Sequence, residues 1–339
     1  MNKNISIYFE SALRLKLPVI YINTANCLHI PLGKAHYYFV DTITPFNDGG
    51  SIFLAKNKSN LNQLLRNAGF PVSNWTTIHK DTFYKQSLAE LTQNLRFPLV
   101  IKPQLNTHSG IDVVCNIKTL QQLSDCLESK FKRNPFMQIE EFQEGLKEYR
   151  ILLLKNRVIG VVERRESCVI GDGQHTIEQL IINNNQKMAK NSYPILINAE
   201  CQQCLMDQNL NLNCIPVKGK TIRLQYAVNR AHGGRAISLG KKIHSQNAKI
   251  LSNITRLIGL DLVGLDLLCE DINKPFSQTK WFIIEANLGP GVSIHEYPDE
   301  GIKMNVSKKI LMQLIYRHPF AYFLHRISIF RNMGKKCDG

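Results

Sequence analysis

Residues 281–291 read Trp281-Phe-Ile-Ile-Glu285-Ala-Asn287-Leu-Gly-Pro290-Gly291. The first four residues are apolar and predict a short buried strand. Glu285 and Asn287 stand two residues apart, so they project from the same face of that strand. A carboxylate and an amide oxygen side by side suit a hard cation such as Mg²⁺. The stretch taken alone fits a cation site and a salt-bridged acid before a Gly-Pro-Gly turn about equally well.

A second apolar segment lies upstream and carries one acid. Val263-Gly-Leu-Asp266-Leu-Leu reads as another buried strand. An unpaired carboxylate is costly to bury, so Asp266 needs a partner. A metal ion shared with Glu285 and Asn287 supplies one. Ligands that offer only oxygen suit magnesium better than zinc or copper. We therefore predict that Asp266, Glu285 and Asn287 form a metal site.

Further blocks occur in a fixed order before this pair of strands. Pro98-Leu-Val-Ile-Lys102-Pro103 predicts a strand that ends in a lysine, and a turn with Ser109-Gly110 follows. Phe136-Met-Gln-Ile-Glu140-Glu141-Phe142 predicts a strand with acids at its end, followed by Glu148-Tyr149-Arg150. This order resembles the ATP-grasp superfamily of ATP-dependent carboxylate–amine ligases.

The closer likeness is to the ATP-grasp region of cyanophycin synthetases and of the glutathione-synthesising fusion enzymes. It spans roughly Ser51 to Val306, and the N-terminal and C-terminal regions of the full cyanophycin synthetases are too large to fit in this chain. The blocks that carry it are Glu163-Arg164, Val169-Ile-Gly171-Asp172-Gly173-Gln-His175-Thr176-Ile177, Asn229-Arg-Ala-His-Gly233-Gly234, Ile258-Gly-Leu-Asp261-Leu-Val-Gly264-Leu-Asp266 and Glu285-Ala-Asn287…Pro290-Gly291…His295…Pro298.

The resemblance implies an α+β fold in which two α+β lobes hold ATP between them. We expect a small N-terminal α/β region at residues 1–50 and the ligase domain at 51–306. Within that domain, we expect the small ATP-binding lobe at 98–165 and the metal-binding lobe at 166–306. A basic amphipathic tail is expected at 307–339.

The resemblance also implies roles for side chains around ATP and Mg²⁺ or Mn²⁺. Lys102 matches the lysine that meets the phosphates, and Glu148 matches the acid that holds the ribose hydroxyls. The adenine-contacting segment corresponds to Glu140, Glu141 and Phe142. Phosphate or the acyl substrate is expected to meet Arg150, Arg164 and His295. Simpler alternatives are a strand-end lysine at 102 and a surface salt bridge from Glu148 to Lys147 or Arg150.

Some positions depart from the pattern of the family. Close relatives carry a second lysine where this chain has Asn62, so we expect Lys58, just before it, to contact the cofactor. Gln225, Ser238 and Ser293 stand where relatives carry two arginines and an acid. Because of these changes, recognition of an acidic or peptide substrate and the polymer-making activity are not transferred to this chain.

Our leading prediction is a ligase that forms an amide or peptide bond through an acylphosphate and releases ADP and phosphate. The substrates are a small molecule or peptide with a carboxylate, and an amine acceptor. Three alternatives stay open: glutamylation of a protein tail, a nucleotide-binding module without catalysis, and an interaction protein tethered by its basic C-terminus.

Composition agrees with an enzyme of this kind. A chain of 339 residues, 44% of them apolar, can form two or three lobes with separate cores. The run 17–22 is too short for a signal core or a membrane span. Nine scattered cysteines favour reduced thiols, and Cys201-Gln-Gln-Cys204 lacks the second pair that a zinc site needs. We expect a cytoplasmic protein.

The formal charge of +15 is concentrated near the C-terminus, where 303–339 hold eight basic residues against one acid, Asp338. No motif indicates specific nucleic-acid binding. Apolar residues recur at helical spacing in this tail, at Phe320, Phe323, Leu324, Ile327 and Phe330, with Arg317, Arg326 and Arg331 among them. We expect this stripe to pack on the protein itself or in a homodimer, and binding to a membrane surface is the alternative.

The remaining patterns predict secondary structure. We expect 1–50 to be loop-rich apart from a strand near 19–22, and 98–142 to run strand, strand, helix, strand. A hairpin turning at 155–156 is expected in 148–162, and a polar excursion in 174–226. The expected helices are 59–68, 120–131, 177–182, 248–258 and 305–316.

Overall fold

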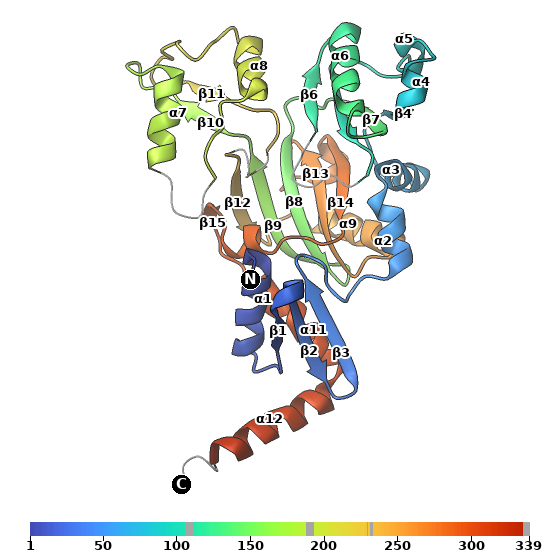
Figure 1. The fold of residues 1–339 in the computed structure, drawn as a ribbon, viewed down its shortest axis with the longest axis vertical. Coiled ribbons are helices and arrows are strands. Elements are labelled where there is room, and N and C mark those ends of the chain that lie inside the picture. The colour runs from blue at the N-terminus through green and yellow to red at the C-terminus, as the bar shows by residue number, and fades with distance from the viewer. Residues whose placement is uncertain (106–111, 188–192, 229, 231–232, 335–339) are drawn as a thin grey trace.

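The protein is described by a computed structural model that covers residues 1–105, 112–187, 193–228, 230 and 233–334, with side chains to 329. The predicted turn at Ser109-Gly110 and the residue Asn229 lie outside this description. Two lobes stand at one end of the elongated molecule, a large sheet occupies its middle, and one helix extends from the other end (Figure 1).

A six-stranded sheet in the order β14-β13-β8-β9-β12-β15 forms the middle of the molecule. Strands β13 and β14 confirm the two predicted around Asp266 and Glu285, and the β8–β9 hairpin turns at Lys155 and Asn156 as predicted. Helix α9 (Ser245–Ile258) covers one face and forms a core with it. The strands are β8 (Lys147–Leu154), β9 (Arg157–Arg165), β12 (Arg235–Gly240), β13 (Leu262–Cys269), β14 (Trp281–Asn287) and β15 (Glu300–Gly301).

A smaller lobe has a four-stranded sheet in the order β4-β7-β5-β6, and helix α6 (Leu120–Phe131) packs on it. The predicted order of strand, strand, helix, strand is confirmed. The predicted lobe boundaries of 98–165 are wrong, because β4 joins this sheet while β8 and β9 join the large one. The elements are β4 (Trp75–His79), α4 (Lys80–Phe83), α5 (Leu88–Leu91), β5 (Leu99–Pro103), β6 (Val114–Ile117) and β7 (Phe136–Glu141).

Two consecutive helices connect the N-terminal region to the small lobe: α2 (Gly49–Lys56) and α3 (Lys58–Asn67). The second confirms the helix predicted at 59–68 to within one residue. Its N-cap is Asn57 and not Ser59, because the Asn57 side chain accepts hydrogen bonds from the backbone of Ser59 and Asn60 at 3.0 and 3.1 Å. The start one residue earlier places Lys58 in the first turn.

The polar excursion forms a third unit with a core of its own. It contains the two-stranded sheet β10 (Cys168–Ile170) with β11 (Thr221–Arg223), and the helices α7 (Ile177–Gln186) and α8 (Ala199–Asp207). The helix predicted near 177–182 is confirmed and extends further. Cys201 and Cys204 lie on α8 and are buried in this core.

The N-terminal region is more regular than its sequence predicts. It contains α1 (Lys3–Arg14) and a three-stranded sheet of β1 (Ile20–Ile22), β2 (Cys27–Leu32) and β3 (Ala35–Val40), with a short turn η1 (Asn23–Ala25). The prediction of a loop-rich segment is therefore wrong.

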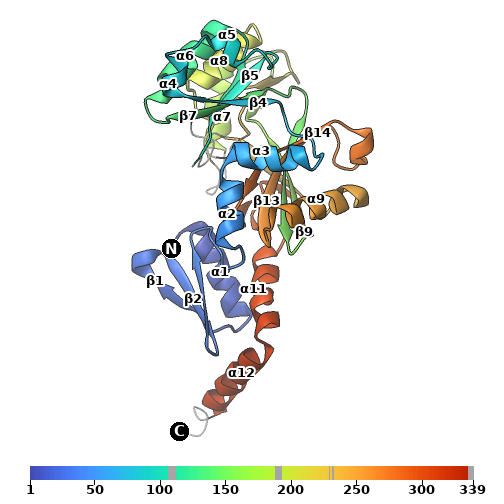
Figure 2. The same ribbon diagram turned by 90° about the vertical axis from the view of Figure 1, so that its right-hand side faces the viewer.

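The predicted tail 307–339 is divided between two helices. Helix α11 (Val306–Arg317) belongs to the N-terminal core, where Ser307 Oγ lies 2.6 Å from Ser11 Oγ of α1. Helix α12 (Pro319–Gly334) instead extends from the body (Figure 2). The prediction that its apolar stripe packs on the protein itself is wrong for Phe320, Phe323 and Leu324, because these side chains are exposed. The side chains of Phe330 and Arg331 lie outside the description. In the part of the chain described here, no helix is both long and apolar enough to span a bilayer.

Candidate active site

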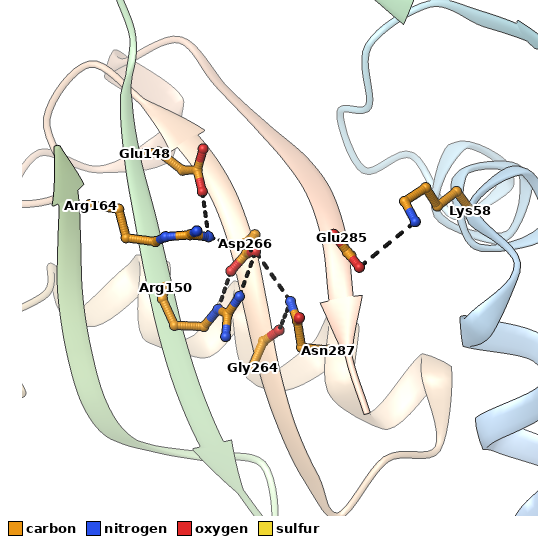
Figure 3. Close-up of polar contacts among 8 residues, drawn as sticks. All are labelled: Lys58, Glu148, Arg150, Arg164, Gly264, Asp266, Glu285 and Asn287. Atoms are coloured by element: carbon orange, nitrogen blue, oxygen red, sulfur yellow. Dashed lines mark hydrogen bonds and ion pairs between the residues drawn. The ribbon is translucent and has the colours of Figure 1, made fainter. Parts of the chain in front are cut away.

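One face of the large sheet gathers most of the predicted site residues (Figure 3). Asp266 on β13 lies opposite Glu285 on β14 and opposite Arg150 on β8. Antiparallel pairing brings directly opposed side chains together on one face. The neighbouring rows of the same face hold Asn287 beside Gly264, and Glu148 beside Arg164.

Asp266 is the centre of this group. Arg150 donates to it with both Nε and Nη2, the latter at 2.8 Å from Oδ2, so the pair is bidentate. Arg164 Nη1 and Asn287 Nδ2 lie at 3.3 and 3.2 Å from the same Oδ2. Burial opposes ionisation of Asp266, but the two guanidinium groups outweigh it and hold the pKa below its ordinary value. Asp266 is therefore a fixed carboxylate.

Glu148 shares Arg164 with Asp266. Its Oε1 accepts from Arg164 Nη1 at 2.7 Å, so its partner is Arg164 rather than Lys147 or Arg150. Burial raises the pKa of Glu148, and Arg164 only partly offsets this effect. The carboxyl group therefore takes up a proton more readily than an exposed glutamate.

Glu285 is the most accessible member of the group, with 31% of its side chain exposed. Lys58 on α3 points toward it, with Nζ at 3.8 Å from Oε1 (Figure 3). Burial lowers the pKa of Lys58, and Glu285 partly opposes that shift. Asn62, one helical turn after Lys58, is buried as well. Lys58 thus brings an ammonium group to this face of the sheet from one helical turn before Asn62.

Lys102 lies on β5 of the small lobe and forms a buried ion pair, with Nζ at 2.7 Å from Oε1 of Glu140 on β7. Gln138 Nε2 also donates to Glu140, and the Gln138 Oε1 accepts from Ser59 Oγ at 2.8 Å. Sequence reasoning missed Gln138 and Ser59. The only local signal for Gln138 was a polar residue between the apolar residues of a strand.

The remaining residues of the adenine-contacting prediction lie at the end of β7. Glu141 Oε1 accepts from Asn74 Nδ2 at 3.1 Å, while the backbone nitrogen of Phe142 donates to Pro98 O at 2.9 Å. The Phe142 ring meets Tyr226 edge to face at 5.8 Å. The side chains of both residues and the backbone nitrogen of Phe142 are thus used in contacts within the protein.

His295 lies apart from these polar contacts, on the short helix α10 (Ser293–Glu296). It is fully buried, and neither ring nitrogen has a hydrogen-bond partner among the residues that the structure describes. The ring sits against Gly160 of β9, where an added Cβ would lie 2.6 Å from Nδ1. Burial, and then the charge of Arg150, lower the pKa of His295 to about 3. It is therefore a neutral, buried side chain on the same face of the sheet as Arg150.

This burial predicts a pH-dependent stability. Between pH 6.5 and about 3 the unfolded chain binds a proton at His295 that the folded chain does not, so stability falls as the pH decreases. The slope from this one group is about 1.4 kcal/mol per pH unit. We expect His295→Gln to lose that part of the slope. Urea unfolding at pH 6.5, 5.5 and 4.5 gives the free energy of unfolding of both proteins. The same dependence on pH in both would contradict a lowered pKa of His295.

A cavity of about 930 Å³ lies near this site, between the small lobe and the third unit. Arg165, the neighbour of Arg164 on β9, contributes to its wall together with Arg223, Arg235 and Tyr226. None of the predicted site residues lines it. Several of its charged residues are engaged in ion pairs, such as Arg223 with Glu166 at 3.1 Å.

The residues on the sheet fit a hard divalent cation. Asp266 and Glu285 supply carboxylate oxygens, and the Nδ2 of Asn287 is used by Gly264 and Asp266, which leaves its Oδ1 for a ligand. No three acids, histidines or cysteines of the described residues are clustered to hold a metal by themselves. Mg²⁺ is typically held by one or two carboxylates together with substrate phosphates. The donor set therefore suits a cation that a bound nucleotide helps to hold.

Comparison with known proteins supports the resemblance predicted from the sequence. The family model described as the D-ala D-ala ligase C-terminus matches residues 64–210. The cyanophycin synthetase of Crocosphaera subtropica is 28% identical over 281 residues, covering 80% of this chain and 32% of the relative. That of Trichormus variabilis is 27% identical over 333 residues, covering 96% and 36%.

A second group of relatives comprises bifunctional glutathione-synthesising proteins. The glutathione biosynthesis bifunctional protein GshAB of Clostridium perfringens is 29% identical over 220 residues, covering 63% of this chain and 28% of the relative. The chain spans about a third of the length of these relatives.

The crystal structure of a bifunctional glutathione synthetase from Pasteurella multocida shares the fold, with a TM-score of 0.64 and 21% identity over 94% of this chain and 44% of that one. The predicted resemblance and the α+β ATP-grasp fold are thereby confirmed. The chain is thus similar in sequence to the D-ala D-ala ligase C-terminus over residues 64–210 and to the cyanophycin synthetases, and it has the fold of the bifunctional glutathione synthetase.

Proposed function

We propose that this protein is an ATP- and Mg²⁺-dependent ligase that joins the carboxylate of a small molecule or peptide to an amine. One observation carries the proposal. Asp266, Glu285 and Asn287 present oxygen donors on one face of the sheet, and Arg150, Arg164 and Lys58 surround them. Fixed cations and a divalent metal are what phosphoryl transfer requires, because its catalysis is mostly positioning and charge neutralisation.

The proposed reaction has two steps. A carboxylate oxygen of the substrate attacks the terminal phosphorus of ATP, the bond to the bridging oxygen breaks, and ADP leaves. The amine then attacks the acyl carbon, and the carbon–oxygen bond breaks. Phosphate departs with the oxygen that came from the substrate, and the amine loses a proton to solvent. No cysteine or serine nucleophile takes part.

The residues of this chain serve this chemistry by binding and orientation. Asp266, Glu285 and Asn287 would hold Mg²⁺, which when bound neutralises phosphate charge. The bidentate contact of Arg150 fixes the Asp266 carboxylate, so that it needs no reorganisation during the reaction.

ATP is proposed to lie between the small lobe and the large sheet. Lys102 and Lys58 would meet its phosphates, and Glu148 would accept hydrogen bonds from the ribose hydroxyls. Arg164 and His295 keep their proposed roles toward phosphate or substrate, Arg164 by contact and His295 from a buried position against Gly160 on the same face of the sheet. We place the ligase unit at 51–306, in a cytoplasmic protein with reduced cysteines.

The products of ATP cleavage test the proposal. We expect ADP and phosphate, because the contacts proposed for Lys58, Lys102 and Mg²⁺ neutralise the terminal phosphates, whereas an adenylating enzyme needs cations at the α-phosphate. The purified protein is incubated with ATP, Mg²⁺ and pooled amino acids and dipeptides, and nucleotides and new amide masses are measured.

Once a substrate is found, its carboxylate is labelled with ¹⁸O. One labelled oxygen should appear in the released phosphate. Stoichiometric AMP, or phosphate without label during amide formation, would overturn the acylphosphate route. ATP that stays intact in the presence of every pool would favour a nucleotide-binding module.

A further inference from the structure

We propose that helix α12 binds the surface of membranes that carry anionic lipids, lying in the plane of the interface. The proposal concerns a part of the chain outside the ligase site and goes beyond the proposed function. It rests on the exposure of the helix, on the way its orientation is fixed, and on its charge.

The apolar side chains of α12 face outward. Phe320, Phe323 and Leu324 are 82%, 60% and 65% exposed, at a spacing that places them on one side of the helix. Ile327 continues this stripe and is partly exposed. A stripe of large apolar residues left open to water is the mark of a surface that binds another apolar phase.

Contacts on the other side hold α12 in this orientation. Tyr322 Oη donates to the carbonyl oxygen of Leu15 at 2.7 Å, and Ala321 packs against Gly33, where an added Cβ would lie 3.2 Å from its own. At the base of the helix, His318 Nε2 lies 2.5 Å from Tyr37 Oη. The body of the protein thus presents the stripe outward and does not leave it free to fold back.

The chain around this stripe is basic, and of its cations Arg317 pairs with Asp261 at 3.4 Å. No acidic residue occurs between Ile302 and Cys337, a stretch that holds eight basic residues. A shallow cavity of about 530 Å³ at the base of α12 is lined by Lys34, Arg317 and His318 together with Phe320. Basic groups beside apolar ones match an anionic headgroup above an acyl chain.

This charge favours a lipid surface over a second copy of the chain. Two copies that met through α12 would bring two such positive regions together, and like charges across an interface are costly. An anionic bilayer instead supplies the opposite charge and an apolar phase for the aromatic rings. The 16 residues of α12 are too few to cross a bilayer, which agrees with a helix that lies along its surface.

Flotation of the full-length protein with vesicles tests the proposal. We expect binding to vesicles of phosphatidylcholine with phosphatidylglycerol and little binding to phosphatidylcholine alone. Each basic residue near the surface should contribute about a fivefold increase in partitioning at low salt. Raising the salt concentration should weaken binding, because it screens the charges.

The variant F320S/F323S/L324S removes the apolar stripe and should lower partitioning about tenfold or more, since each large apolar side chain contributes that much on burial. Phe53→Ser is the matched control, because Phe53 on α2 is 78% exposed and lies outside α12. It should bind vesicles like the unchanged protein. Circular dichroism and ATP consumption check that both variants are folded and active.

Sedimentation velocity on the same proteins tests the alternative that a second copy of the chain covers the apolar stripe of α12. A dimer that the triple variant disrupts, together with equal vesicle binding of all proteins, would show a homodimer interface and overturn the proposal. Absence of binding to anionic vesicles in low salt would overturn it as well. Loss of vesicle binding in the triple variant alone would support it.

Discussion

Glu285→Gln is expected to lower ATP-dependent ligation by about a thousandfold, comparable to the removal of a strong preorganised charge contact. Glu285 is the accessible carboxylate of the proposed metal site, while the oxygens of Asp266 are already engaged by arginines. A neutral amide is a much weaker ligand for Mg²⁺ than a carboxylate. The Mg²⁺ concentration that gives half-maximal activity should therefore rise.

The same change should have little effect on stability. Glutamine has the shape of glutamate, and a third of the Glu285 side chain is exposed. Lys58 loses a partner at 3.8 Å, but burial already lowers its pKa, so it can lose its proton and need not stay charged. Thermal unfolding of the variant should be close to that of the unchanged protein.

The control is Glu128→Gln, which removes one negative charge from an exposed position on α6 far from the sheet face. It should leave both the rate and the Mg²⁺ dependence unchanged. Turnover of Glu285→Gln at the normal rate would show that Glu285 is a salt-bridge partner of Lys58 and not a metal ligand.

The sequence predicts those parts of the fold that depend on local pattern. The helix at 120–131 and the hairpin at 155–156 follow from apolar spacing and turn residues, and the structure confirms both. The N-terminal helix α1 was missed, although Ile5, Tyr8 and Ala12 have helical spacing and Asn2 caps it with a hydrogen bond to Ile5. Its signal was present but overlooked among short polar segments.

Features that depend on distant pairing were not accessible in the same way. The sequence indicates that Asp266 needs a partner, but not that register places Arg150 directly opposite it from 116 residues away. The lobe boundary failed for the same reason, because β8 is adjacent in sequence to β7 but pairs with β13. Which sheet a strand joins is decided by partners far along the chain.

Lys102→Ala is expected to reduce turnover about a hundredfold or more, as for other preorganised charges that stabilise transferred phosphate. The change has a second effect, because Lys102 and Glu140 form a buried ion pair at 2.7 Å. Removing one partner leaves a buried charge uncompensated, and we expect this to lower the free energy of unfolding by about 3–5 kcal/mol. A loss of activity in this variant is therefore ambiguous.

A double variant separates the two effects. Lys102→Met with Glu140→Gln replaces both charges by neutral groups of similar shape, and Gln138 can still donate to the amide oxygen at position 140. Replacing both partners of a buried pair is often nearly neutral for stability. The urea-unfolding midpoint should recover, and Glu140→Gln alone reports any separate effect of that position on activity.

The outcome then depends on what Lys102 does. If its ammonium group contacts ATP phosphates, the double variant is stable but stays about a hundredfold slower than Glu140→Gln alone. If Lys102 serves only to neutralise Glu140, the need for it disappears with that charge, and turnover returns to the level of the single variant. Recovery of turnover together with stability would therefore assign Lys102 to the packing of the small lobe, and the phosphate contact would have to come from Lys58 or the arginines of β8 and β9.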